Sequence, residues 1–265
     1  FHTAENHVKL LIVDEKYFLM GGTNIHSRLI REVSVPQLED KVENSACRLM
    51  DKASRDLDIA GNGQELARAM RRQFFNLFYT FESRKNRDAP YRFFDLEDSA
   101  KGTCNEFENE EGLINDVRMK FLCSGPEHRH KNPITREYKT RIKNAKKSVH
   151  LASLFFRPGS KIKKALRKAK VPVTCILNGD KGKGSFLRLL SNVFPARAHY
   201  DLATHVYEYG RDCLYHKKVA VIDDTAIIAS ANFSKKSSRY DTEVGLVIED
   251  KRVSERCLQT LREDM

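Results

Sequence analysis

The sequence predicts an α/β fold made of two similar sandwich halves with mixed sheets. Two observations lead to this prediction. Between residues 117 and 265, short apolar segments with strand periodicity are separated by segments with helical periodicity. In addition, a pattern of polar residues near residue 7 recurs near residue 216, each time inside a predicted β-hairpin. A local structure that occurs twice along one chain indicates two related halves.

The second half alternates strands and helices. Strands are predicted at 117–123, 149–156, 171–177 and 205–209, before the hairpin that starts at residue 216. Helices are predicted at 132–145, 160–169, 186–193 and 253–261. The first of them shows the clearest signals, because Asn132 is a good N-cap and Pro133 suits the first turn. Its apolar residues form one stripe: Ile134, Tyr138, Ile142 and Ala145.

The first half is much shorter. Residues 1–82 are predicted to be the C-terminal part of such a half, residues 83–116 a polar, acidic linker or insertion, and residues 117–265 the second half. About a hundred residues of strand and helix precede the second copy of the polar pattern, whereas the first copy lies almost at residue 1. We therefore expect the first half to be N-terminally truncated in this sequence. Such a half would have an open sheet edge.

The polar pattern itself is a His-x-Lys followed, after four residues, by an Asp. Each copy continues through a small-residue turn to an Asn: the first is His7, Lys9, Asp14 and Asn24, and the second is His216, Lys218, Asp223 and Asn232. The alternation of a strand places each His beside its Lys, with the Asn on the neighbouring strand. Imidazole acts as acid or base near neutral pH, and Lys and Asn side chains stabilise charged oxygens. The duplicated set therefore suits chemistry on a phosphodiester.

The paired pattern resembles the two HKD motifs of the phospholipase D superfamily, whose members bring one motif from each half to a single active site. Four accessory segments look most like bacterial cardiolipin synthases and phospholipases D: residues 125–126, 151–158, 206–209 and 241–245. The resemblance implies a phospholipase D-like fold and a displacement in two steps. One His attacks phosphorus and forms a phosphohistidine, and the other protonates the leaving alcohol and then activates water or a second alcohol. By analogy His7 is the nucleophile and His216 the acid, although the sequence does not rank them.

The resemblance also implies roles for the other motif residues. It gives Lys9, Lys218, Asn24 and Asn232 the task of holding the non-bridging phosphate oxygens. No metal or cofactor takes part in this scheme. Asp14 and Asp223, which lie at the hairpin turns, are predicted to fix those turns through hydrogen bonds.

Supporting residues lie further along the chain. Glu243 matches the acidic partner that orients a family histidine, and Asp56 holds the comparable place in the first half. Ser234, two residues after Asn232, matches a phosphate contact of the family. The sequence departs from the family pattern at His26, where a Ser is usual, and at Ser54, where a Trp often stands. These departures leave the fit to a particular substrate open.

The charge is unevenly distributed. The formal net charge is +11, yet residues 95–116 contain eight acidic residues and one lysine, a balance of −7 that leaves +18 for the rest. Such a surface favours anionic partners, either acidic lipids or nucleic acid. The densest basic run is 157–170, which is a solvated helix face or a membrane-facing surface. Apolar runs within this chain are too short for a membrane span. We expect a peripheral membrane location because basic residues are attracted to an anionic bilayer. The six Cys, at widely spaced positions, show no metal-ligand spacing.

Three functions remain open at this point. The leading hypothesis is a phospholipid-directed phosphodiesterase that acts by hydrolysis or by phosphatidyl transfer. The alternatives are a nuclease of the same superfamily and a truncated remnant without activity. Oligomeric state and head-group preference are not encoded in any pattern that we identify.

Overall fold

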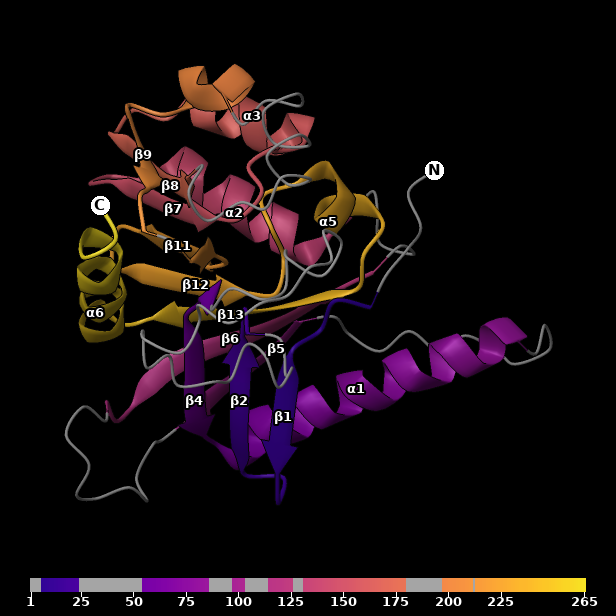
Figure 1. The fold of residues 1–265 in the computed structure, drawn as a ribbon. Coiled ribbons are helices and arrows are strands. Elements are labelled where there is room, and N and C mark those ends of the chain that lie inside the picture. The colour runs from indigo at the N-terminus through magenta and orange to yellow at the C-terminus, as the bar shows by residue number, and fades with distance from the viewer. Residues whose placement is uncertain are drawn as a thin grey trace, which may run out of the picture.

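The computed structural model describes residues 6–23, 54–85, 97–102, 114–125, 131–179, 197–211 and 213–265. Asn24, His26 and the helix predicted at 186–193 lie outside these residues. The described part has the predicted α/β class, with one eight-stranded sheet, one three-stranded sheet and one two-stranded pairing (Figure 1).

The second half contains the large mixed sheet. Its order is β5 (Glu97–Gly102), β6 (Val117–Ser124), β13 (Glu243–Glu249), β12 (Thr225–Ala229), β11 (Lys218–Ile222), β7 (Val149–Ser153), β8 (Val173–Asn178) and β9 (His205–Tyr209). Strands β7, β8 and β9 are parallel, and the other pairs are antiparallel. The helices in the described part of this half are α2 (Pro133–Asn144), α3 (Ser160–Arg167), the short α5 (Lys235–Arg239), α6 (Lys251–Arg262) and the 3₁₀ helix η3 (Arg197–Leu202).

The first half repeats the centre of this sheet. An antiparallel hairpin of β1 (Leu10–Val13) and β2 (Tyr17–Gly21) is joined by β4 (Asp58–Asn62), and α1 (Gln64–Lys85) follows. The same succession of two hairpin strands, a third strand and a helix occurs in β11, β12, β13 and α6. Within the described residues β1 is an edge strand, and its Leu11 and Val13 are 47% and 43% exposed.

Two apolar cores hold these layers together. The first lies between the two repeats, where Phe18, Met20 and Met70 pack in one cluster with Val219 and Ile228. The second lies under α2 and α3, on the opposite face of the large sheet (Figure 1). The predicted stripe on α2 belongs to this second core, and all of its residues are buried: Ile134, Tyr138, Ile142 and Ala145. The predicted N-cap is confirmed too, because Asn132 Oδ1 accepts a 2.8 Å hydrogen bond from Thr135 N.

The structure differs from the sequence-based expectation in two places. Residues 97–102, within the stretch predicted to be a polar, acidic linker or insertion, form β5 at the edge of the large sheet. The sequence of this segment, Glu-Asp-Ser-Ala-Lys-Gly, lacks the apolar alternation that predicts a strand. In addition, β1 begins at Leu10 and β11 at Lys218, so each motif histidine precedes its strand.

No described helix combines the length and the apolar composition that crossing a bilayer requires.

Candidate active site

Backbone pairing between the two halves positions both histidines. Asn6 forms a bridge with Thr242, and His7 N donates to Thr242 O at 2.9 Å. In the same way β10 (Leu214–Tyr215) pairs with β3 (Ser54–Arg55), and His216 N donates to Arg55 O at 3.0 Å. Each His therefore follows a segment that is paired with the opposite half. This explains why neither His lies on the strand of its own hairpin.

The backbone pairing between the halves also brings a carboxylate from one half to the histidine of the other. His7 Nδ1 lies 3.0 Å from Glu243 Oε2, and His216 Nδ1 lies 3.0 Å from Asp56 Oδ2. Glu243 immediately follows Thr242, and Asp56 immediately follows Arg55, so the two pairs are equivalent. The Glu243 side chain is fully buried and that of Asp56 is 6% exposed. Two related carboxylate–histidine pairs thus form where the halves meet.

These contacts determine which nitrogen of each imidazole ring carries the hydrogen. An ionised carboxylate only accepts hydrogen bonds, so Nδ1 of each ring carries the hydrogen. Nε2 is then the nitrogen with the lone pair, ready to attack or to take a proton. Lys218 Nζ also lies 2.9 Å from Nδ1 of His216, but it donates instead to His216 O at 2.5 Å. Burial lowers the pKa of His216, and Lys218 and Lys9 add to this effect against the opposing influence of Asp56.

The two lysines repeat one geometry as well. Lys9 Nζ donates to His7 O at 2.9 Å, just as Lys218 donates to the carbonyl of His216. Burial lowers the pKa of Lys218 to about 7, and the charge of Lys9 contributes, while Asp56 and Glu243 oppose the change. Burial also lowers the pKa of Lys9, again against Glu243 and Asp56. The lysines of both motifs therefore share one electrostatic environment with both carboxylates.

Small residues let the backbone approach the two carboxylates. Ser230 Oγ donates to Glu243 Oε2 at 2.5 Å. At the corresponding position of the first half stands Gly22, where a Cβ atom would lie 2.4 Å from Asp56 Oδ1. In the first copy the acidic side chain, Asp56, is therefore shorter than Glu243, and the backbone at Gly22 lies closer to the carboxylate. This is a physical reason why the turn is Gly-Gly-Thr in one copy and Ser-Ala in the other.

Of the remaining predicted residues, Asn232 and Ser234 follow β12, whereas Asp14 and Asp223 lie at the hairpin turns. Asn232 is partly buried, and its Oδ1 has no hydrogen-bond partner among the described residues. Ser234 is the N-cap of α5 and accepts from Ser237 N at 3.0 Å. Asp223 accepts hydrogen bonds from three backbone amides, Lys146 N, Lys147 N and Ser148 N. Asp14 adopts the same positive φ, 53°, as Asp223. Asn24 lies outside the described residues.

Asp264 is a supporting residue that the motif pattern does not indicate. It accepts from Arg55 Nε at 3.0 Å and from the Tyr215 hydroxyl at 3.2 Å, and it forms an ion pair with the fully buried Lys217. Arg55 precedes Asp56, while Tyr215 and Lys217 flank His216. The carboxylate near the end of the chain thus fixes the segments that carry one complete carboxylate–histidine pair. No local signal could have identified it, because all three partners are distant in sequence.

The sequence of the chain is similar to those of several known proteins. A family model described as "Cardiolipin synthase, PLD-like domain" matches residues 138–265. Cardiolipin synthase B of Salmonella typhi is 33% identical over 143 residues, which are 51% of this chain and 32% of that protein. Cardiolipin synthase 2 of Bacillus anthracis is 25% identical over 150 residues, which are 56% of this chain and 29% of that protein. The chain spans about a third of the length of these curated relatives.

A solved structure extends the similarity of fold to the first half. The crystal structure of phosphatidylserine synthase from Haemophilus influenzae Rd KW20 aligns with a TM-score of 0.59 and 15% sequence identity. The alignment covers 98% of this chain and 62% of that one. The arrangement of both halves, and not only of the second, is therefore that of a known fold.

Proposed function

The chain belongs to the phospholipase D superfamily, and we propose that it cleaves a phospholipid phosphodiester through a phosphohistidine and passes the phosphatidyl group to water or to an alcohol. The observation that carries this proposal is the crossed pairing of His7 with Glu243 and of His216 with Asp56. Two imidazoles in equivalent environments, each with Nδ1 bound to a carboxylate, form a matched nucleophile and acid.

In the first step, Nε2 of His7 attacks phosphorus while His216, in its imidazolium form with a hydrogen on each nitrogen, gives the Nε2 proton to the leaving alcohol. His7 is the more accessible of the two side chains, 25% exposed against 9% for His216, which favours it as the group that attacks phosphorus. The carboxylate of Glu243 stabilises the positive charge that develops on its ring. In the second step, the other imidazole takes a proton from water or from an alcohol, whose oxygen displaces His7 from phosphorus.

The lysines and Asn232 stabilise the phosphate during both steps. Burial lowers the pKa of Lys218, so its charged form is less favoured in the substrate-free protein than that of an exposed lysine. A bound phosphodiester anion favours the charged form of Lys218, so Lys218 carries more positive charge when the substrate is present. Asn232 offers its amide to the same oxygens, and Asn24 has the equivalent role in the first motif.

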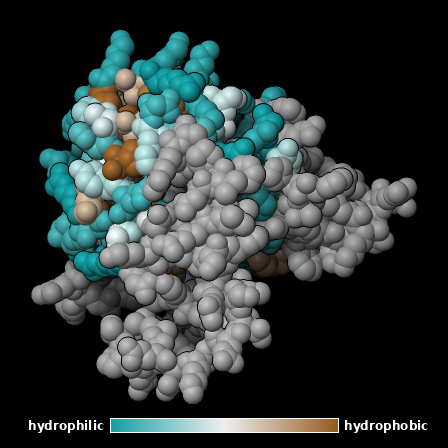
Figure 2. Space-filling model, turned by 45° about the horizontal axis from the view of Figure 1, so that its top comes forward, coloured by the Kyte–Doolittle hydropathy of each residue, from teal (hydrophilic) through white to brown (hydrophobic). Residues whose placement is uncertain are grey.

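A lipid substrate is favoured over nucleic acid by the relatives and by the surface. The curated relatives reported above are cardiolipin synthases. The α3 helix buries Ile162 and Leu166, while its Lys161, Lys164 and Arg167 are exposed. Figure 2 shows this end of the molecule turned toward the viewer, with a largely hydrophilic surface. Each basic residue near an anionic bilayer contributes about 1 kcal/mol to binding, so this helix suits a peripheral membrane surface.

The test presents the full chain with phosphatidylglycerol vesicles and, separately, with single-stranded DNA. The proposal predicts release of glycerol or formation of cardiolipin from the vesicles, and loss of this activity in His216→Ala. His205→Ala is the matched control, because His205 lies on β9 and is exposed. Cleavage of DNA alone would favour the nuclease alternative, and no reaction with either would favour the inactive remnant.

A further inference from the structure

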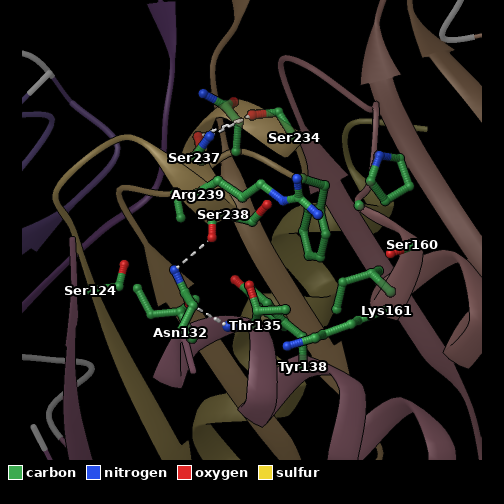
Figure 3. Close-up of a pocket in the computed structure, with 17 residues that line it drawn as sticks. Ser124, Asn132, Thr135, Tyr138, Ser160, Lys161, Ser234, Ser237, Ser238 and Arg239 are labelled. Carbon is green, nitrogen blue, oxygen red and sulfur yellow. Dashed lines mark hydrogen bonds between the residues drawn. The ribbon is translucent and has the colours of Figure 1, made fainter. Parts of the chain in front are cut away.

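A pocket beside the proposed phosphate site contains polar groups that the two-histidine chemistry does not use. Its walls come from α2, from the start of α3 and from the segment 231–239 that includes α5 (Figure 3). The pocket has a volume of about 90 Å³. One water needs roughly 10–15 Å³ in the same measure, so a ligand of several non-hydrogen atoms fits.

Three polar atoms on this pocket have no hydrogen-bond partner within the described part of the chain: Ser124 Oγ, Tyr138 Oη and Asn232 Oδ1. Ser124 and Tyr138 are only 1% and 4% exposed. Buried hydroxyl groups without partners are costly, so they indicate a place where a ligand supplies the missing hydrogen bonds. A hydroxyl both donates and accepts, which makes a ligand with several hydroxyls the best complement.

The pocket adjoins the catalytic groups at two points. Asn232 belongs to both the pocket wall and the second motif. Ser124 is the register partner of Glu243 on the neighbouring strand, and Glu243 holds His7. Tyr138 lies within electrostatic reach of the same carboxylate: burial raises the pKa of Tyr138, and the charge of Glu243 raises it further. The hydroxyl of Tyr138 therefore stays protonated and able to donate at any pH where the enzyme would work.

The charged residues that line the pocket indicate which class of ligand it can bind. The described residues that line the pocket include two cations, Lys161 and Arg239, and no carboxylate. The ammonium group of an amino alcohol would be buried here without a counter-charge, which costs free energy. A neutral or anionic polyol avoids this cost. Hydroxyl side chains are abundant around the pocket: Thr135, Ser160, Ser234, Ser237 and Ser238.

From this geometry we infer that the pocket is the acceptor subsite for a small polyol, with Tyr138 and Ser124 as its specificity-determining residues. The inference rests on the proposed function. One hydroxyl of the bound polyol attacks the phosphohistidine: a new P–O bond forms, the P–N bond to His7 breaks, and the hydroxyl proton passes to Nε2 of the other imidazole. The remaining hydroxyls bind Tyr138 Oη and Ser124 Oγ. These contacts hold the polyol in place, so that it competes with water for the phosphohistidine.

The kinetic test supplies phosphatidylcholine vesicles with glycerol, ethanolamine or 1-propanol at equal concentration. The ratio of transfer product to phosphatidic acid is measured for each alcohol. The ratio for glycerol is expected to exceed the other two at least ~10-fold, and Tyr138→Phe is expected to lower it at least ~5-fold. Tyr207→Phe is the matched control, since it removes a hydroxyl from the exposed face of β9. Equal ratios for the three alcohols, or an unchanged ratio in Tyr138→Phe, would overturn the inference.

A binding test separates this inference from the proposed function. Saturation-transfer NMR on the full chain is expected to detect glycerol contact that weakens in Tyr138→Phe and persists in Tyr207→Phe. If glycerol binds in this way but no phosphodiester is turned over, the proposed function fails and the pocket assignment stands. If glycerol does not bind, or binds equally well to Tyr138→Phe with circular dichroism unchanged, the pocket assignment fails.

Discussion

Glu243 Oε2 lies 3.0 Å from Nδ1 of His7, although 236 positions separate the two residues in the sequence. The equivalent contact, between Asp56 and His216, runs in the opposite direction between the halves. Neither half therefore contains a complete carboxylate–histidine pair. Docking of the two halves is a condition for orienting either imidazole ring.

The first prediction concerns the charge of Glu243. Glu243→Gln keeps the size of the side chain but removes the charge that stabilises the imidazolium of His7. In serine proteases the corresponding exchange lowers kcat about 10⁴-fold, and here we expect a decrease of at least ~10²-fold. Glu249→Gln removes a carboxylate from the other end of β13, where it pairs with Arg141, and is expected to retain the wild-type kcat. A folded Glu243→Gln variant with undiminished kcat would show that this carboxylate does not assist catalysis.

The second prediction concerns the anchor at Asp264. Asp264→Asn leaves the fully buried Lys217 without its counter-charge. Breaking a buried ion pair on one side costs roughly 3–5 kcal/mol, so we expect the free energy of unfolding in urea to fall by about 3 kcal/mol. Glu263→Gln is the control, because Glu263 is 56% exposed and lies 3.7 Å from Arg55. Its removal should change stability by less than about 1 kcal/mol. Equal effects of the two substitutions would contradict the anchoring role.

The third prediction follows from the low pKa of Lys218. In the folded protein this pKa is about 7, below the value of about 10.4 expected in the unfolded chain. Between these values the unfolded chain binds more protons, so this residue makes stability rise as the pH increases from 7 to 10. Lys218→Met removes the titrating group. The variant is expected to exceed the wild type in stability by more at pH 7 than at pH 10, as measured by urea unfolding. A difference that does not change with pH would mean that Lys218 titrates normally.

Local patterns predicted the elements, but not the way in which the site is assembled. The apolar stripe on α2 and its cap at Asn132 are confirmed because helix periodicity and capping are properties of neighbouring residues. Only the family resemblance indicates that Glu243 and Asp56 orient the histidines, because these contacts depend on docking of the halves and no local periodicity encodes them. Asp264 and the unpartnered hydroxyl of Tyr138 escaped prediction for the same reason. The helical stripe places Tyr138 on the apolar face of α2, where it is buried, but its hydrogen-bond partners depend on the tertiary fold.

The central claim is that His7 and His216 act together on one phosphorus atom. The most direct measurement compares the rates at which the wild type, His7→Ala, His216→Ala and the double variant hydrolyse bis(4-nitrophenyl) phosphate, a probe that requires neither a lipid nor a particular acceptor. Groups that act as a unit have non-additive effects. Each single variant is therefore expected to lose at least ~10²-fold in kcat/KM, and the double variant to lose little more. Undiminished hydrolysis by either single variant, or losses that simply multiply in the double variant, would contradict the claim.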